Sequence, residues 1–441
     1  MDTRRNFLLQ AAMVGVGATA VPQSLYSLGR QATSTVHFRD EKSTDRVDEI
    51  LSHIQNCGII NTHAHHLPDA ESTELNLERI FQRSYIYWSD ESTPSTPAEV
   101  DKWIAKIGNR SFFVSLSRAL QLLYAMDEPV SGAVWDEYNR RILKAYENPN
   151  WHLEVLKKKC GYHAVVQDSY WNPGHNNDHP EIFKPTFRIN FFLFGYNHHN
   201  KDHNGNNAQL AYNQHIDNIN TYTDFMYRVI KEKKAGGCSS LKSAIAYDRS
   251  IEIGAATAKE AQAAMGFGKK EPSAAVIRKF QDYIFDVICE IAANEKIPLQ
   301  IHTGLGIMAG SNPMLLQSLI KRHPDTTFVL MHGGYPWMDD LCGLVHVYSN
   351  VIVDLCWLPL ISPSASVRFL HELFEVCNAD KIVWGCDTWT SEESWGALLS
   401  MVNVLSTVLD EKVSAGYLSK KNAIQLAEDI MCNNAKRWFC L

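Results

Sequence analysis

Short apolar runs separated by longer segments with helical spacing dominate the chain from about residue 46 onward. Eight runs have the length and the β-branched or aromatic content of buried strands. The first begins at Ile59 and carries His63, and the others are 162–167, 187–192, 240–245, 298–302, 327–332, 351–355 and 381–387. Between the later runs lie amphipathic segments such as Ala275–Ala293, with apolar residues every three or four positions. Because short strands that alternate with helices pair in parallel, the pattern predicts an α/β protein, a (β/α)8 TIM-type barrel.

The region between the first two runs lacks this alternation. From about residue 70 to 160, apolar residues such as Trp103, Ile104 and Ile107 fall at helical spacing, with no strand-like run. We interpret residues 70–160 as an all-helical insertion after the first strand. The barrel domain is then expected to span 46–441, with a polar linker at 31–45 and a first helix over about Arg46–Asn56.

The first thirty residues have the pattern of a targeting segment. The pair Arg4-Arg5 precedes Phe7-Leu8-Leu9 and a small, apolar stretch from Ala11 to Val21. This pattern resembles a twin-arginine export signal. We therefore expect residues 1–30 to engage the export machinery and the mature protein to be periplasmic or secreted. No other apolar run approaches the roughly 20 residues that a bilayer requires, so we expect no membrane span in the mature protein.

Composition excludes some classes of partner. The chain has 441 residues, 45% of them hydrophobic and 21% charged, with a formal net charge of −7. These values are ordinary for a globular protein, and the net negative charge gives no excess of lysine and arginine for binding nucleic acid. Nucleic acid is therefore not an expected partner. The ten cysteines form no C-x-x-C pair, and we expect most of them to be buried thiols. A small molecule is the expected substrate.

Polar residues recur where the predicted strands end, which is where TIM-type barrels place their chemistry. Burying such groups without partners costs about 1 to 3 kcal/mol each, so their repetition indicates a shared site. His63 and His65 lie two positions apart on the first strand and therefore share a face. The six candidates are His63, His65, Lys242, His302, His332 and Asp387. A set of three imidazoles and one carboxylate (His63, His65, His302, Asp387) is typical of a catalytic metal site with an open position.

These segments resemble the amidohydrolase superfamily and, within it, the amidohydrolase-related branch, from about residue 46 to residue 441. The matching segments are Asn61–His65, Gln300–Gly304, Met331–Pro336, Trp384–Asp387 and Asn434–Arg437. Leu241–Arg249 is also similar to amidohydrolase domains fused to glutamine-synthetase-like proteins. The resemblance implies that His63, His65, His302 and Asp387 hold a divalent metal. It also implies that His332 either helps to bind a second metal or acts on the substrate.

Lys242 has more than one interpretation. The resemblance implies that it could be carbamylated and bridge two metals, whereas a charged lysine could bind a substrate carboxylate or pair with Asp387. We favour the substrate contact, and Arg249 is a second candidate for it because arginine binds carboxylates bidentately. A surface ion pair is the alternative for Arg249.

Other histidines and tryptophans near the strand ends have simpler interpretations. We expect His198, His199 and His203 to lie in a solvated loop, and His66 to point away from His65 as a packed or supporting group. Three tryptophans follow the sixth, seventh and eighth strands and either line an apolar pocket or pack in the core: Trp337, Trp357 and Trp389.

The predicted function is hydrolysis of a C–N or C–O acyl bond in a small, carboxylate-bearing molecule by metal-activated water. Asp387 would bind the metal and move the proton, and His332 would polarise the carbonyl. Zinc suits these ligands, and manganese, iron and cobalt fit them as well. We favour one ion over two. Three alternatives stay open: a metal-dependent decarboxylase, a uronate-isomerase-like enzyme, and a periplasmic binding protein on a degenerate barrel. A homo-oligomer is compatible with the sequence.

Overall fold

The structure is a computed structural model that describes residues 50–89, 92–265 and 271–441. The predicted export segment (1–30), the linker (31–45) and the expected start of the barrel domain at residue 46 lie outside the described residues. Residues 50–57 are helical and lead directly into the first strand, in the place where the sequence predicts the first helix.

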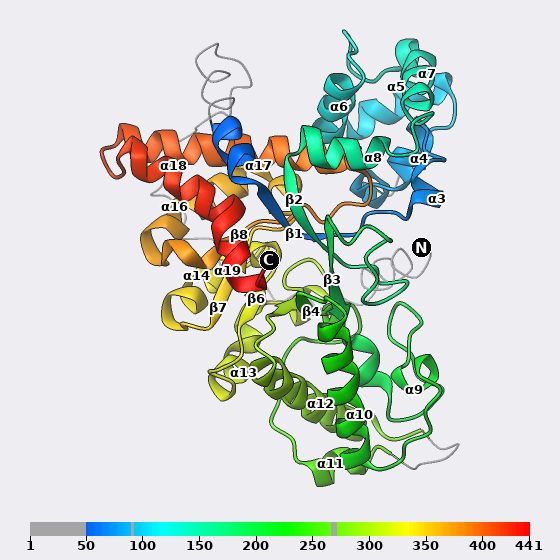
Figure 1. Ribbon diagram of the computed structural model, residues 1–441, viewed down its shortest axis with the longest axis vertical. Helices are drawn as coiled ribbons and strands as arrows, with labels where there is room; N and C mark the ends of the chain where they lie inside the picture. The colour runs from blue at the N-terminus through cyan, green and yellow to red at the C-terminus, as the bar shows by residue number, and fades with distance from the viewer. Residues whose placement is uncertain (1–49, 90–91, 266–270) are drawn as a thin grey trace, which may run out of the picture.

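Eight parallel strands follow one another around a sheet in sequence order (Figure 1). They are β1 (Ile59–Ala64), β2 (Tyr162–Gln167), β3 (Phe183–Arg188), β4 (Ser240–Ser243), β5 (Leu299–Ile301), β6 (Phe328–Leu330), β7 (Val351–Asp354) and β8 (Ile382–Val383). The order confirms the predicted α/β class and the TIM-type barrel.

Backbone hydrogen bonds join the end of the sheet to its beginning. The N–H of Thr62 donates to the carbonyl of Trp384 (3.1 Å), and the N–H of Asp387 donates to that of His63 (2.8 Å). Gly385 makes this approach possible, because a Cβ there would lie 2.6 Å from the backbone nitrogen of His63. The eighth and first strand segments therefore lie close enough to share a site.

The third strand differs from its prediction. The sequence pattern predicts a strand over 187–192, whereas β3 is Phe183–Arg188, and the next apolar residues form a 3-10 helix, η4 (Asn190–Phe194). Pro185 lies inside β3, and proline weakens a sequence-based strand assignment. The buried residues Phe191 and Phe192 form an apolar run that resembles a strand. The predicted strand was therefore placed too far toward the carboxyl terminus. The correction makes Arg188 a strand-end residue.

Helices fill the chain between β1 and β2 and form a lobe beside the barrel, at the upper right of Figure 1. The described residues between these two strands contain no strand. They form α3 (Asp69–Ser72), α4 (Leu77–Gln82), η1 (Tyr85–Ser89), α5 (Pro97–Ile107), α6 (Ser111–Leu123), η2 (Gly132–Val134), α7 (Trp135–Ala145), α8 (Trp151–Glu154) and η3 (Val155–Lys159).

The remaining helices connect and cover the later strands. These helices are α9 (Ala208–Ala211), α10 (Ile219–Ala235), η5 (Ile245–Tyr247), α11 (Ala258–Gln262), α12 (Ala274–Asn294), η6 (Met308–Gly310), η7 (Pro313–Leu316), α13 (Gln317–Arg322), η8 (His332–Gly334), α14 (Met338–Val347), α15 (Leu358–Ile361), α16 (Pro363–Val376), η9 (Ala379–Lys381), α17 (Ser391–Ser414), α18 (Lys420–Glu428), η10 (Asp429–Asn433) and α19 (Asn434–Phe439). The long amphipathic helix expected at 275–293 is confirmed as α12.

A buried carboxyl on α17 connects the helical lobe to the barrel. Glu392 accepts hydrogen bonds from the hydroxyls of Tyr124 (2.6 Å) and Tyr146 (2.9 Å), both from the lobe. Burial raises the pKa of Glu392, although these two bonds oppose the shift. Because α17 begins soon after β8, these bonds fix the lobe relative to the strand ends.

Apolar side chains, most of them small or branched, fill the interior of the barrel. They form one buried cluster: Ile60, Ala164, Val166, Val329, Ile352, Val383, Ala435 and Phe439. Such filling leaves the polar strand ends as the part of the barrel where a ligand can enter.

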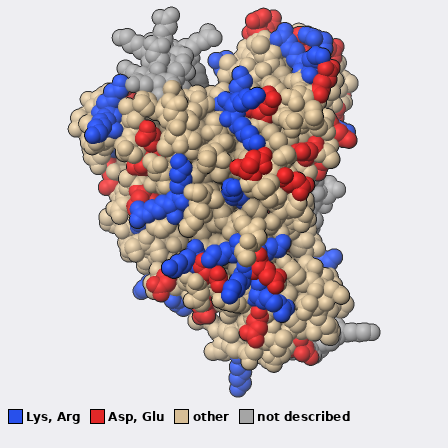
Figure 2. Space-filling model, in the orientation of Figure 1, with Lys and Arg blue, Asp and Glu red and all other residues tan. Residues whose placement is uncertain are grey.

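Two surface properties bear on the predicted partners. On the face seen in Figure 2, lysine and arginine are interspersed with aspartate and glutamate and form no single basic area. Among the described residues, no helix is both long and apolar enough to cross a bilayer.

Candidate metal centre

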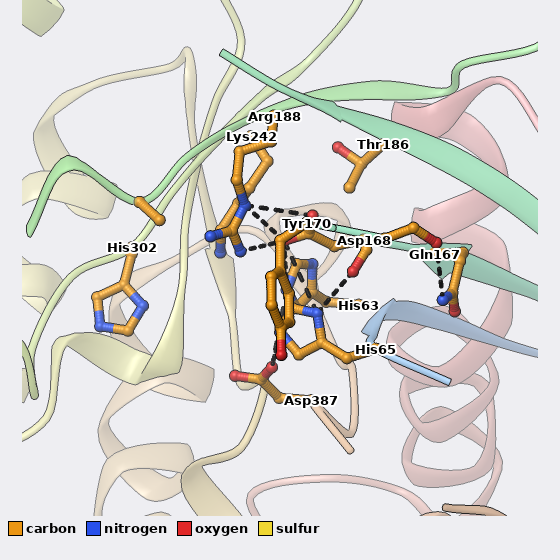
Figure 3. Close-up of polar contacts among 12 residues, drawn as sticks. His63, His65, Gln167, Asp168, Tyr170, Thr186, Arg188, Lys242, His302 and Asp387 are labelled. Atoms are coloured by element: carbon orange, nitrogen blue, oxygen red, sulfur yellow. Dashed lines mark hydrogen bonds and ion pairs between the residues drawn. The ribbon is translucent and has the colours of Figure 1, made fainter. Parts of the chain in front are cut away.

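Three of the four predicted metal ligands converge at the carboxyl ends of the strands (Figure 3). His63 lies in β1, His65 directly follows it and Asp387 follows β8, and one ligand atom from each lies within 4.8 Å of the others. The Nε2 atoms of His65 and His63 lie 3.0 and 3.7 Å from Oδ1 of Asp387. All three side chains are buried.

Local backbone contacts orient these ligands. Nδ1 of His65 lies 2.7 Å from the carbonyl oxygen of Asp168, which can only accept a hydrogen bond. The other ring nitrogen, Nε2, then lies on the side of Asp387, the arrangement that metal-ligating histidines generally show. Asp387 itself has a φ of 60°, a conformation that costs a residue with a side chain about 1 to 3 kcal/mol. The surrounding barrel therefore holds the carboxylate in place.

The charges of these groups fit a divalent cation. Burial would raise the pKa of Asp387, but His65, His332 and Lys242 together outweigh burial and lower it to about 2. Burial and the nearby Lys242 lower the pKa of His63 well below its usual value. At neutral pH the group thus offers an ionised carboxylate and a neutral imidazole, as metal binding requires. Neither Oδ1 of Asp387 nor Nδ1 of His63 has a well-aligned hydrogen-bond partner among the described residues, so both have capacity for a ligand.

Sequence reasoning missed two charged members of this site, Asp168 and Arg188. Asp168 follows β2, and its Oδ2 lies 3.7 Å from Nε2 of His63 and 3.9 Å from Nδ1 of His65. Arg188 ends β3 and contacts Asp168 with two nitrogens, the closer at 2.5 Å. Burial would raise the pKa of Asp168, but the charge of Arg188 keeps it lowered.

Lys242, from β4, is the third charged side chain beside the ligands. It is buried, and its amine contacts the sulfur of Met331. Burial lowers the pKa of Lys242 to about 8, while Asp387 and Asp168 oppose the shift. Lys242 and Arg188 therefore place two cationic groups next to the candidate metal ligands.

His302 and His332 form a separate pair. Nδ1 of His302 lies 2.9 Å from Nε2 of His332, and Nδ1 of His332 lies 3.1 Å from the carbonyl oxygen of Cys356. Burial lowers the pKa of His332 to about 4, so its ring is neutral at pH 7. The carbonyl accepts the single proton of that ring, so Nε2 accepts one from His302. The outer Nε2 of His302 lies 3.3 Å from the carbonyl oxygen of Leu305, which can only accept a hydrogen bond.

His302 thus lines the same cavity as the other predicted ligands but does not join their close group. Instead, His332 and Cys356 each bring a ligand atom within 4.8 Å of one from Asp387. The cavity is about 10 Å³, and its lining residues are His63, His65, Tyr85, Arg188, Lys242, Ala244, Tyr247, His302 and Asp387.

Arg249, the second predicted substrate contact, is not among these lining residues. Its guanidinium lies 2.7 Å from Asp282 and also donates to the carbonyl of Glu252. Its charge is engaged in an ion pair, as in the alternative interpretation, but this pair is largely buried and does not lie at the surface.

The neighbouring aromatic and imidazole groups divide between the site and the core. Trp389 stacks on His65 with ring centroids 5.3 Å apart, and Trp357 meets the ring of His332 edge-on at 5.4 Å. His203 is mostly buried rather than solvated, with Nδ1 2.9 Å from Asp248. His66 packs on Phe183 at 5.6 Å, as expected for a packed side chain.

Comparison with known proteins finds a family similarity in the carboxyl-terminal part of the chain. The amidohydrolase family model matches residues 245–441. This segment contains His302, His332 and Asp387, while His63 and His65 lie outside it. The resemblance inferred from the sequence motifs is supported over this part of the chain.

A curated relative matches over a shorter region. Protein fluG of Emericella nidulans is 35% identical over 148 residues, which are 32% of this chain and 17% of that protein. The match therefore spans less than a fifth of the relative.

Solved structures match over most of the chain. A uronate isomerase from Thermotoga maritima has a TM-score of 0.71 at 13% identity, covering 90% of this chain and 97% of that one. A candidate metal-dependent hydrolase from Lactobacillus casei ATCC 334 has a TM-score of 0.68 at 16% identity, covering 89% and 97%. At these identities the likeness establishes the fold.

Proposed function

We propose that this chain is a metal-dependent hydrolase that cleaves a C–N or C–O acyl bond in a small, carboxylate-bearing molecule. The observation that carries the proposal is the buried group of His63, His65 and Asp387, with one ligand atom from each within 4.8 Å of the others. Two imidazoles and a carboxylate suit zinc, and also manganese, iron or cobalt. A divalent ion held there would lower the pKa of water from 15.7 to about 7 and supply hydroxide at neutral pH.

The protein's own residues perform the remaining steps. Asp387 has two carboxylate oxygens, so one can hold the ion while the other accepts the proton of the attacking water and passes it to the leaving group. His332, whose Nδ1 lies 3.7 Å from Oδ2 of Asp387, is placed to stabilise charge on the substrate carbonyl. His302, which lines the same cavity, would provide a fourth ligand if it gave up its contact with the carbonyl of Leu305.

Arg188 and Lys242 support a carboxylate on the substrate. Both line the strand-end cavity and are buried, and buried cations favour a ligand that neutralises them. Asp168 neutralises part of the charge of Arg188, which leaves Lys242 as the cation with less compensation. A charged lysine is consistent with its role as a substrate contact.

The test is a product assay on metal-loaded protein with a panel of N-acyl amino acids, lactones, hydroxybenzoates and uronates. Hydrolysis predicts a free acid with its amine or alcohol, and activity that the Asp387→Ala variant abolishes. Asp380→Asn is the matched control, because Asp380 lies just before β8 and pairs with Arg437 on the surface. Carbon dioxide or a ketose as the only product would replace the hydrolase by a decarboxylase or an isomerase. Protein that holds no metal would favour a binding protein.

A further inference from the structure

Arg188 is held from three sides at the end of β3. Its Nε and Nη2 atoms contact the carboxylate of Asp168 (Figure 3), and its guanidinium lies over the ring of Tyr170, 5.3 Å from the centroid. On a further side, Nη1 lies 3.5 Å from Nε2 of His203. These contacts engage one N–H each of Nε, Nη2 and Nη1 among the five that an arginine carries. The other two have no partner among the described residues, and Arg188 lines the strand-end cavity, so they are available to a ligand there.

The segment that carries His203 is a tight turn rather than an open loop. Oδ1 of Asp202 accepts hydrogen bonds from the N–H groups of Asn204 and Asn206, both 2.9 Å away. The N–H of Gly205 donates to the carbonyl of Asp202 (2.8 Å), and Gly205 has a φ of 80°, which glycine adopts readily. Aspartate side chains commonly close turns in this way. The local sequence therefore sets the position of His203.

Asp248 fixes the ring of His203. Oδ2 of Asp248 lies 2.9 Å from Nδ1 of His203, and Oδ1 accepts the backbone N–H of the same histidine (2.7 Å). The side-chain amide of Asn190 also donates to Oδ2 of Asp248 (2.8 Å). The side chains of His203 and Asp248 are only 11% and 6% exposed. These contacts are therefore largely shielded from water and hold the imidazole in one orientation.

The partners of the two ring nitrogens determine where the proton of His203 lies. A carboxylate can only accept, so Nδ1 carries the proton toward Asp248. A guanidinium can only donate, so Nε2 presents its lone pair to Arg188. The side-chain amide of Asn204 lies 3.0 Å from the same Nε2 and donates to it as well. His203 is thus a hydrogen-bond acceptor for Arg188, and the carboxylate behind it strengthens this role.

The neighbouring Lys242 explains why Arg188 needs such support. Arg188 and Lys242 are register partners on β3 and β4, and both line the strand-end cavity. Like charges at this spacing repel each other, and the charge of Arg188 adds to the burial that lowers the pKa of Lys242. Without a ligand between them, repulsion favours an arginine turned away from the cavity. Asp168 and His203 oppose this rotation.

We propose that His203 and Asp248 are positioning residues that hold the guanidinium of Arg188 toward the carboxylate of the substrate. The inference rests on the proposed function for the presence of that carboxylate. Asp168 holds the Nε side of the guanidinium, and His203 holds Nη1. The free N–H groups are then directed to the ligand before it binds, which reduces the entropy that binding costs.

The test compares two small probes on the full-length, metal-loaded protein by calorimetry. 4-Oxopentanoate and 4-oxopentanamide share a ketone and a chain length, and they differ only in a carboxylate against a neutral amide. Because hydrogen bonds from a cation to a charged acceptor are the stronger ones, we expect the acid to bind at least about tenfold tighter than the amide. His203→Phe keeps a flat ring but removes the acceptor, so we expect the preference to fall below about threefold while the affinity for the amide is unchanged.

Two further variants separate positioning from folding. His203→Gln places an amide oxygen close to the position of Nε2 and should keep the preference above about fivefold. His199→Phe is the matched control, because His199 belongs to the same segment but is exposed, and it should keep the full preference. Thermal melting should verify that each variant folds.

A double variant tests whether His203 acts through Arg188. Arg188→Lys keeps a cation beside Asp168 but has no second nitrogen for His203. In that background, His203→Phe should change the acid preference by less than about twofold, because residues that act through each other are not additive. A His203→Phe effect of the same size in both backgrounds would show that the histidine does not position this arginine.

Equal binding of the two probes by the unaltered protein, or binding of neither, would overturn the proposal, as would a preference that His203→Phe leaves intact. These outcomes do not depend on catalysis, which the product assay measures separately. An acid preference that requires His203, in a protein that hydrolyses no acyl bond, would support the positioning role and contradict the hydrolase. Hydrolysis without an acid preference would support the hydrolase and contradict the carboxylate contact.

Discussion

Histidines lie at the carboxyl ends of two pairs of neighbouring strands, which we call the β1–β8 edge and the β5–β6 edge. The histidines are organised differently at these two places. At the β1–β8 edge, His65 directs one ring nitrogen to a backbone carbonyl and the other to Asp387. At the β5–β6 edge, His302 and His332 share a hydrogen bond. The first edge is arranged for a cation before one binds, whereas the second must give up the Leu305 contact before His302 can ligate. The difference comes from the backbone carbonyl beside each ring, that of Asp168 for His65 and that of Leu305 for His302.

Removing a ligand from the β1–β8 edge should have the largest effect. We expect His65→Ala to lose its metal and at least about 1,000-fold in kcat/KM, because metal catalysis supplies several kcal/mol of transition-state stabilisation. Metal content by mass spectrometry and activity on the best substrate of the panel are the measurements. His66→Gln is the control, since His66 is equally buried but lies outside the ligand group. Metal retained by His65→Ala would show that this edge is not the binding site.

The β1–β8 edge also depends on the ion pair between Asp168 and Arg188. We expect Asp168→Asn to lower the free energy of unfolding by about 3 to 5 kcal/mol, because it leaves a buried guanidinium without its partner. Chemical denaturation measures this loss. Asp380→Asn breaks a largely exposed pair with Arg437 and should cost less than about 1 kcal/mol. Similar losses in both variants would mean that burial does not determine the value of this pair.

The sequence predicts the barrel and much of the site because both follow from local patterns. Apolar runs of strand length mark the eight strands, and polar residues at their ends mark His63, His65, Lys242 and Asp387. The same signal was present for Asp168, which directly follows the run 162–167. Arg188 was hidden, because the apolar residues after it moved the predicted strand by four positions.

Side-chain orientation is the part that the sequence does not contain. His302 and His332 were predicted at their strand ends, but their pairing depends on the carbonyls of Leu305 and Cys356. Those carbonyls belong to the segments after β5 and β7, whose paths depend on packing across the barrel. The cavity between the helical lobe and the barrel likewise needs two segments that are far apart in the chain, the start of α6 and the α15–α16 junction.

A substitution at the β5–β6 edge tests whether that edge serves catalysis rather than binding. We expect His332→Asn to reduce kcat by about 100-fold, the loss typical of one group that stabilises a developing oxyanion. Bound metal should remain near the level of the unaltered protein. His346→Asn is the control, because His346 also contacts a carbonyl through Nδ1 (2.7 Å) but lies at the surface. Loss of metal from His332→Asn would make it a ligand and remove the contrast between the edges.

The smallest predicted effect concerns a second carboxyl near the β1–β8 edge. Burial raises the pKa of Glu393 to about 8, although the N–H groups of Tyr85 and Trp389 oppose the shift, while the nearby Asp387 has a pKa of about 2. A raised folded-state pKa means that Glu393 stabilises the fold fully below about pH 4.5 and that this contribution is lost as pH rises through 8. Glu393→Gln stays neutral, so we expect its melting temperature to exceed that of the unaltered protein by a few degrees at pH 8.5. At pH 5 the two should melt within about a degree of each other. A difference that is the same at pH 5 and pH 8.5 would show that Glu393 does not titrate in this range, and that the two carboxyls of this edge do not differ in charge.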